Sequence, residues 1–197
     1  MSAEAIYVVR HGETEWNRAG RRQGRSDSPL TFRGRSQAVA VAKLLRPLLE
    51  DAERVTIECS PLGRTSVTAR ILCRELRLPE HVLVRAPLLA ELDHGEWEGL
   101  TAGEIETRFP GALAERERDK WSYVMPGGES YASAHERARR WLAARKPGET
   151  VVAVTHEMLS RTLRGAYAGS APQEMLALAH PHDRVFRLRG GASEELG

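Results

Sequence analysis

Short apolar runs alternate with longer amphipathic stretches along this chain, a pattern typical of strands alternating with helices. Residues 6–9 are β-branched and aromatic, are too short for a helix and run into Gly12, so they predict a buried strand. Residues 151–154 are apolar on both faces, which is typical of a central strand. The remaining short runs predict strands over 55–59, over 81–85 at a sheet edge, and near 184–189.

Apolar residues at helical spacing mark the segments between these runs. A helix is predicted to start near residues 29–31, because the apolar positions that follow lie on one helical face: Ala38, Val41, Ala42, Leu45, Leu48 and Leu49. Further helices are predicted from Pro61 to about residue 76, from about 130 to 145, and after His156 to about 168. Between 93 and 128 only short helical pieces are expected, over 102–108 and 112–121.

This order of elements predicts the fold class. Strands that alternate with helices form an α/β structure, here a three-layer α/β/α sandwich with a mostly parallel central sheet. The 197 residues have the size of one domain, and no repeat or low-complexity linker divides them. We therefore expect a single domain over 1–197, with a small insertion at about 100–128. In such sheets, ligands bind beyond the carboxyl ends of the strands.

Charge and composition exclude several other classes of protein. The 29 basic and 27 acidic side chains are interspersed, so the net charge of +2 indicates a solvated mixed-charge surface and no nucleic-acid partner. No apolar run approaches the roughly 18 residues of a membrane span, and residues 1–5 lack a secretory signal. Cys59 and Cys73 fit no metal spacing and predict reduced, buried thiols. We expect a cytoplasmic protein without a membrane partner.

Three clusters of polar residues follow predicted strands. Arg10 and His11 end the first strand, Arg64 follows the second, and His156 ends the strand over 151–154. Two imidazoles and two guanidiniums therefore converge on one rim of the sheet. The guanidinium fork matches phosphate oxygens in geometry and charge, and a neutral imidazole is a competent nucleophile toward phosphorus. These clusters point to phosphate chemistry.

The run Arg-His-Gly-Glu-Thr-x-Trp-Asn at positions 10–17 resembles the signature of the histidine phosphatase superfamily, whose fold is phosphoglycerate mutase-like. Further matches follow in family order and span about positions 5 to 165. They include Gln23-Gly24, Asp27-Ser28-Pro29-Leu30-Thr31, Ser60-Pro61-Leu62-x-Arg64, Glu91, Gly95-x-Trp97-Glu98-Gly99, Pro126-Gly127-Gly128-Glu129-Ser130 and Val154-Thr155-His156.

The resemblance implies a role for each matching position. His11 would be the nucleophile that forms a phosphohistidine, and Glu91 would protonate the leaving oxygen and then deprotonate the attacking water. Arg10, Arg64 and His156 would hold the equatorial phosphoryl oxygens. Asn17, Gln23 and Gly24 would line the phosphate pocket, the first two with side-chain amides and Gly24 with its backbone N–H. The resemblance implies a small phosphorylated metabolite as partner, no metal ion and no cofactor, and a homodimer as the oligomeric state to test.

Glu157 departs from the family pattern, which usually has glycine directly after the second histidine. A carboxylate that pointed inward would repel the substrate and raise the pKa of His156. We expect Glu157 to turn outward in the first turn of the following helix, where a negative charge is favoured. Altered substrate choice or low activity is the alternative.

Several other residues invite a functional role, and the simpler structural interpretation is preferred for each. Asp93 and His94 are expected to support the following turn, and Arg161 to form a structural pair. Residues 180–183 resemble a metal-ligand cluster but are expected to form an exposed loop. A solvated amphipathic helix accounts for the basic and aromatic residues of the insertion, although they would also suit an anionic or ring-bearing leaving group. These residues are Arg116, Arg118, Lys120, Trp121 and Tyr123.

Three functions remain open at this stage. The resemblance favours the phosphatase branch, a metal-independent phosphomonoester hydrolase, because Trp97-Glu98-Gly99-Leu100-Thr101 is similar to that branch. A cofactor-dependent phosphoglycerate mutase is the first alternative, but Ala102 stands where mutases carry a lysine. A phosphate-binding regulator with little turnover is the second alternative, for which Glu157 is the only hint.

Overall fold

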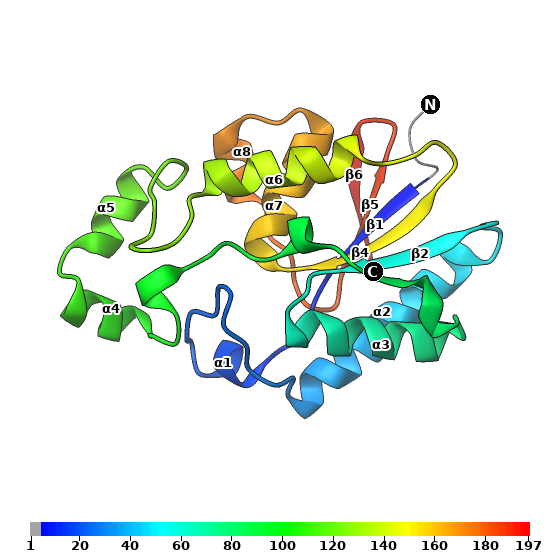
Figure 1. Cartoon of the computed structure of the whole chain (residues 1–197), viewed down its shortest axis with the longest axis horizontal. Coiled ribbons are helices and arrows are strands. Elements are labelled where there is room, and N and C mark those ends of the chain that lie inside the picture. The colour runs from blue at the N-terminus through cyan, green and yellow to red at the C-terminus, as the bar shows by residue number, and fades with distance from the viewer. Residues whose placement is uncertain (1–4) are drawn as a thin grey trace.

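The computed structural model describes residues 5–197, in which six strands form one sheet of order β3-β2-β4-β1-β5-β6 (Figure 1). The four strands from β3 to β1 pair in parallel, whereas β5 runs antiparallel to β1, and β6 to β5. The predicted, mostly parallel sheet is therefore confirmed. The strands are β1 (Ala5–Arg10), β2 (Val55–Cys59), β3 (Leu83–Arg85), β4 (Thr150–Thr155), β5 (Val185–Arg189) and β6 (Ala192–Leu196).

Helices cover both faces of this sheet, with α2 and α3 on one side and α6 and α7 on the other (Figure 1). The α-helices are α1 (Glu15–Arg18), α2 (Phe32–Leu49), α3 (Gly63–Leu76), α4 (Ala102–Arg108), α5 (Ala112–Arg118), α6 (Tyr131–Ala143), α7 (Glu157–Ala168) and α8 (Pro172–Ala177). Three 3₁₀ helices are η1 (Glu80–Val82), η2 (Pro87–Leu89) and η3 (Gly95–Trp97). The helices α4 and α5 stand apart from the sheet, in the predicted insertion.

The strand β1 shows why the sheet is covered twice. Its side chains alternate between faces, so Ile6 and Val8 pack in the core under α6 and α7, while Tyr7 and Val9 pack in the core under α2 and α3. All four side chains are buried. An apolar run without polar alternation therefore requires a helix layer on each face, which is the predicted three-layer arrangement.

Some predicted elements have different bounds. Residues 81 and 82 lie in η1 instead of a strand, because β3 pairs with β2 only at positions 83–85. The helix predicted over 112–121 ends at Arg118, since Asp119 leaves the helical conformation and accepts hydrogen bonds from Ser122 and Tyr123 in a turn. The short helix α8 and the edge strand β6 were not predicted.

The topology brings three strand ends together. The neighbours β2, β4 and β1 are parallel, so the residues that follow them, Ser60, His156 and His11, leave the same edge of the sheet side by side. Within the described residues, no helix is long and apolar enough to cross a bilayer. Residues 1–4, on which the expected lack of a secretory signal partly rests, lie outside the described residues.

Candidate active site

His11 follows β1 and is buried. Its Nδ1 lies 2.8 Å from the backbone oxygen of Gly12, and because a carbonyl only accepts, the proton sits on Nδ1 and Nε2 carries the lone pair. Burial lowers the pKa of His11 well below its usual 6.5, and the charges of Arg64 and Arg10 lower it further. His11 is thus a neutral imidazole of defined tautomer on the wall of a pocket that Arg10 and Arg64 also line.

His156 follows β4 and is fully buried behind this wall, with its ring centroid 5.1 Å from that of His11. The Nε of Arg64 donates to His156 Nδ1 at 3.2 Å, so His156 carries its proton on Nε2, which is 2.8 Å from Ser60 Oγ. Burial, followed by the charge of Arg64, lowers the pKa of His156 well below 6.5. Both ring nitrogens therefore have protein partners, and His156 contacts the pocket through its neighbours.

Arg64 opens α3 and reaches the pocket with its guanidinium buried. Besides His156 it donates to the backbone oxygens of Ser26 and Gly24, each at 2.7 Å, and to Asp27 Oδ1 at 2.9 Å. The loop over 24–27 therefore holds this cation in place. Gly24 lines the pocket as predicted, and its carbonyl holds Arg64. The position requires glycine, because φ is +55° and a Cβ would lie 2.3 Å from Glu98 Oε1.

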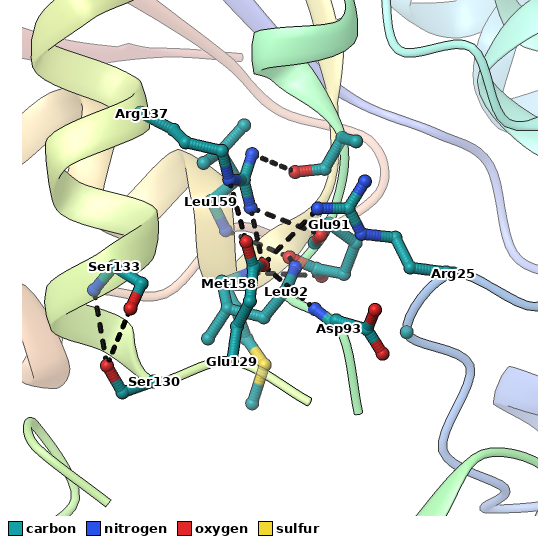
Figure 2. Close-up of polar contacts among 12 residues, drawn as sticks. Arg25, Glu91, Leu92, Asp93, Glu129, Ser130, Ser133, Arg137, Met158 and Leu159 are labelled. Carbon is teal, nitrogen blue, oxygen red and sulfur yellow. Dashed lines mark hydrogen bonds and ion pairs between the residues drawn. The ribbon is translucent and has the colours of Figure 1, made fainter. Parts of the chain in front are cut away.

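Glu91 also lines the pocket, and the backbone N–H groups at the start of α7 hold its carboxyl group (Figure 2). Its Oε1 accepts from the N–H groups of Leu92 and Leu159, both at 3.0 Å, and its Oε2 from Met158 at 3.3 Å. Burial raises the pKa of Glu91 above 4.5, while these backbone hydrogen bonds and Arg64 offset part of the rise. A carboxyl group that keeps its proton more readily than usual is suited to general acid catalysis.

A clamp from α6 holds the segment that carries Glu91. Arg137 donates to the backbone oxygens of Leu88, Ala90 and Glu91 at 3.0, 2.9 and 3.3 Å, and its Nη2 bonds Glu129 Oε2 at 2.9 Å (Figure 2). Glu129 belongs to the Pro-Gly-Gly-Glu-Ser motif at 126–130. The Glu129 side chain of this motif holds Arg137, which in turn holds the backbone of Glu91.

Asn17 and Gln23 line the pocket as predicted. Asn17 Oδ1 accepts from the backbone N–H of Thr14 at 3.1 Å in the capping box of α1, which leaves the amide N–H groups of Asn17 for a ligand. Gln23 is buried, and its Oε1 has no hydrogen-bond partner among the described residues. The pocket has a volume of about 270 Å³.

Glu157 does not turn outward. It lines the pocket, with Oε2 3.0 Å from Arg10 Nη1 and Oε1 bonded to Arg161. The i, i+4 spacing on α7 brings Arg161 to Glu157, and the proximity of β1 and α7 brings Arg10. The pairing expected of Arg161 is thus present. The outward orientation expected of Glu157 was wrong, because two neighbouring cations attract the carboxylate more strongly than the helix N-terminus does.

A second group of cations lines the pocket, and it consists of Arg22, Arg116 and Lys120, called the outer cations below. Arg116 is buried in the pocket wall and Lys120 lines the pocket, so the expected solvated helix is wrong for these two residues. Both pair with Glu117, at 2.9 and 3.2 Å. Arg22 lines the same wall, and within residues 5–197 its guanidinium has no hydrogen-bond or ion-pair partner. Burial and the charge of Arg116 lower the pKa of Arg22. One carboxylate therefore faces three cations.

His94 also lines the pocket, with Nε2 3.2 Å from Met158 Sδ and with Nδ1 unpartnered among the described residues. Burial lowers its pKa to about 3, so it is neutral. The neighbouring Asp93 accepts from the N–H of Gly95 at 2.8 Å, which is the predicted support of the turn. His94 precedes that turn and also forms part of the pocket wall.

The expectation of an exposed loop at residues 180–183 was wrong for both histidines. His180 is buried, and its carbonyl accepts from Arg10 Nη1 at 2.8 Å. His182 Nδ1 lies 2.6 Å from the backbone oxygen of His11. No spacing in the sequence indicates this contact, because the two residues are 171 positions apart. Across the part of the chain that the structure describes, no three His, Cys, Asp or Glu side chains are grouped to hold a metal ion.

The chain resembles known proteins in sequence and in fold. The family model described as the histidine phosphatase superfamily (branch 1) matches residues 6–194. Phosphoserine phosphatase 1 of Hydrogenobacter thermophilus is 33% identical over 167 residues, which cover 83% of this chain and 76% of that protein. Human 6-phosphofructo-2-kinase/fructose-2,6-bisphosphatase 3 is 33% identical over 188 residues, 95% of this chain. The chain spans only 34% of that longer relative.

A solved structure shows the same fold. Mycobacterial glucosyl-3-phosphoglycerate phosphatase, in a complex with VO3, superposes with a TM-score of 0.80 at 27% identity. The match covers 98% of this chain and 97% of that one.

Proposed function

The chain belongs to branch 1 of the histidine phosphatase superfamily, and we propose that it hydrolyses phosphomonoesters through a phosphohistidine on His11 without a metal ion. One observation carries the proposal. A neutral imidazole of defined tautomer, two guanidiniums and a carboxyl group of raised pKa line the same pocket at the carboxyl ends of parallel strands. A nucleophile, a cradle for charge and a proton donor are the parts that this reaction needs.

In the first half-reaction, the lone pair of His11 Nε2 attacks phosphorus as the bond to the ester oxygen breaks. The electron pair of that bond goes to the leaving oxygen, which takes the proton from Glu91. In the second half-reaction, water attacks the phosphohistidine and gives a proton to the Glu91 carboxylate. The P–N bond breaks, inorganic phosphate leaves and His11 regains its lone pair. Glu91 thus acts first as acid and then as base.

The guanidinium groups beside His11 stabilise the transferring phosphoryl group. Arg10 and Arg64 present guanidinium N–H groups to its oxygens, and Asn17 and Gln23 add amide N–H groups. We assign His156 to the same unit through Arg64, since it accepts from that guanidinium and packs against the His11 ring. In this arrangement charge develops where donors already stand, so little reorganisation is needed.

The outer cations favour substrates that carry a second negative charge. Arg22, Arg116 and Lys120 face one carboxylate, and a second anionic group on the leaving group would complete that balance. The relatives named above act on phosphoserine, fructose 2,6-bisphosphate and glucosyl-3-phosphoglycerate, each of which carries a carboxylate or a second phosphate. We therefore propose a small phosphorylated metabolite with a second negative charge.

The test is phosphate release from a panel of phosphomonoesters by the wild-type protein and the His11→Ala variant. The panel contains phosphoserine, 3-phosphoglycerate, sugar phosphates, α-ribazole phosphate and p-nitrophenyl phosphate. We expect release that His11→Ala abolishes, that EDTA leaves intact and that vanadate blocks, because vanadate mimics the five-coordinate transition state. Substrates with a second anion should have the highest kcat/KM.

Three outcomes would contradict the proposal. Full activity in a folded His11→Ala variant would exclude His11 as the nucleophile. Loss of activity on addition of EDTA, with recovery on addition of a divalent cation, would exclude a mechanism without a metal ion. Isomerisation of 3-phosphoglycerate with a bisphosphorylated primer, without phosphate release, would make the protein a mutase.

A further inference from the structure

The loop between α8 and β5 holds the backbone of the nucleophile. His182 Nδ1 lies 2.6 Å from the backbone oxygen of His11, and because a carbonyl only accepts, His182 carries its proton on Nδ1 and donates it. Its ring centroid is 5.5 Å from that of His11. Burial, with the charge of Arg10, lowers the pKa of His182 to about 4, so the ring is neutral near pH 7.

This hydrogen bond is one of two on a single peptide group. The peptide between His11 and Gly12 is held at its oxygen by His182 and at its nitrogen by Thr68, whose Oγ1 accepts from Gly12 N–H at 3.2 Å. The backbone around it is closely packed, since a Cβ at Gly12 would lie 2.1 Å from the oxygen of Gly34. Rotation of this peptide plane would break both hydrogen bonds.

The next carbonyl sets the tautomer of the nucleophile. Gly12 O accepts from His11 Nδ1 at 2.8 Å, and this contact leaves the lone pair on Nε2. The direction of that carbonyl depends on the peptide plane before it, which His182 and Thr68 hold. A hydrogen bond outside the pocket is therefore linked through two peptide groups to the nitrogen that attacks phosphorus.

The same loop also holds the neighbouring cation. His180 O accepts from Arg10 Nη1 at 2.8 Å. The His180 ring is itself fixed, because Nδ1 lies 2.5 Å from Ser160 Oγ and the ring packs edge-on against Phe186 at 4.7 Å. Two consecutive residues of the active site, Arg10 and His11, are thus anchored to one loop close to the C-terminus.

We propose that His182 is a positioning residue of the reaction: its Nδ1–H holds the His11 carbonyl so that His11 keeps the Nδ1–H tautomer and presents Nε2 as the nucleophile. The proposal rests on the phosphohistidine mechanism for its catalytic consequence. Its structural content, the tautomer of His11, does not depend on any substrate. His182 itself does not line the pocket.

The test uses two substitutions of His182 and one control. His182→Phe keeps a ring against His11 but removes the donor, whereas His182→Asn keeps a short N–H donor. His81→Phe replaces an exposed histidine of η1 that does not line the active-site pocket. Thermal unfolding selects the variants that remain folded.

The first readout is the tautomer of His11. Long-range ¹H–¹⁵N spectra of ¹⁵N-histidine-labelled protein distinguish the two tautomers, and the seven histidines of the chain give few signals. The His11 signals are identified by their loss in His11→Asn. We expect a single Nδ1–H tautomer in the wild type, His182→Asn and His81→Phe, and a mixture of tautomers in His182→Phe.

The second readout is the rate of the first half-reaction, measured as the release of p-nitrophenol from p-nitrophenyl phosphate in a single turnover, with the protein in excess. We expect about a tenfold slower release in His182→Phe and a rate within about threefold of wild type in His182→Asn, since a misplaced reacting atom is costly while a retained donor restores its position. An unchanged tautomer in folded His182→Phe would overturn the proposal, as would a His182→Asn variant in which His11 is as mixed as in His182→Phe. Equal release of p-nitrophenol by the wild type and by folded His11→Asn would instead contradict the phosphohistidine mechanism, and the tautomer spectra would still decide the role of His182.

Discussion

At the residue scale, the pocket pairs a histidine whose pKa is lowered with a carboxyl group whose pKa is raised. Burial is the main cause of both shifts, because it disfavours the charged form of either group. His11 therefore carries a lone pair at neutral pH, and Glu91 is protonated over a wider pH range than an exposed glutamate.

Glu91→Gln should separate the two half-reactions. With p-nitrophenyl phosphate, whose leaving group needs no proton, we expect phosphohistidine to form but to be hydrolysed about 10²–10⁴-fold more slowly, because the general base is missing. With an alkyl phosphate, formation itself should slow by a similar factor. Trapped acid-labile phosphate on the protein measures both effects. Unchanged steady-state turnover of the alkyl ester would exclude Glu91 as the acid.

Glu157→Gln tests whether the carboxylate on Arg10 competes with the substrate. Removal of one negative charge beside the phosphate cradle should tighten vanadate inhibition about two- to fivefold, the scale of a partly exposed ion pair. The same change at the exposed Glu53 is the control. Weaker inhibition in Glu157→Gln would mean that the carboxylate positions Arg10 instead of opposing the anion.

At the scale of elements, the site depends on how helices reach the sheet edge. The first amides of α7 hold Glu91, and Arg137 of α6 clamps the segment before it (Figure 2). The nucleophile is held by a loop from the far end of the chain. Each chemical group is therefore oriented by an element other than its own.

Arg137→Gln should loosen the segment that carries Glu91. We expect the free energy of unfolding to fall by about 2 kcal/mol, because Glu129 and three carbonyls lose their charged partner. The turnover of alkyl phosphates should fall more than that of p-nitrophenyl phosphate, since only the former needs the acid. Arg140→Gln, at an exposed position of the same helix, is the control. Equal losses with both esters would point to general destabilisation alone.

Two helical glycines offer a matched test of close packing. At Gly34 in α2, a Cβ would lie 2.0 Å from the oxygen of Glu13, whereas at Gly103 in α4 no described atom lies within 4 Å. We expect Gly34→Ala to destabilise the protein by about 2 kcal/mol or more and to lower activity, because the loop after His11 must move. Gly103→Ala should stabilise α4 by up to about 1 kcal/mol. Urea unfolding of both variants checks the difference, and similar values for the two would refute it.

At the scale of the whole molecule, burial of histidine makes stability depend on pH. The pKa values of His94 and His182 are lowered to about 3 and about 4, and those of His11, His156 and His180 are also lowered by burial. Below pH 6.5 the unfolded chain binds protons that the folded protein does not. The free energy of unfolding should therefore fall as the pH drops below about 7.5, by up to about 1.4 kcal/mol per pH unit for each histidine.

Glu91 acts with the opposite sign, because its raised pKa lets the folded protein bind a proton first, and it offsets a small part of the loss. Urea unfolding at pH 7.5, 6.5 and 5.5 measures the net effect. A free energy of unfolding that does not change over this range would show that the histidines are protonated equally in the folded and unfolded states.

Elements with strong local patterns were predicted well. The bounds of β2 and α4 agree with prediction, and Thr31 caps α2 where the helix was expected to start. The predicted bounds were wrong where pairing with a neighbouring strand determines the secondary structure. Strand pairing shortened β3, and β6 is a strand because β5 offers it an edge, although its own residues are polar.

The sequence by itself determined the layers of the fold and the residues that meet at the strand ends, because hydrophobic periodicity and the order of parallel strands are local and topological properties. Tertiary structure alone decided the direction of Glu157, the burial of Arg116 and the contact of His182 with His11. These outcomes depend on charges and carbonyls that the fold brings near from distant segments. No periodicity encodes such contacts, since their energy arises only once the chain has packed.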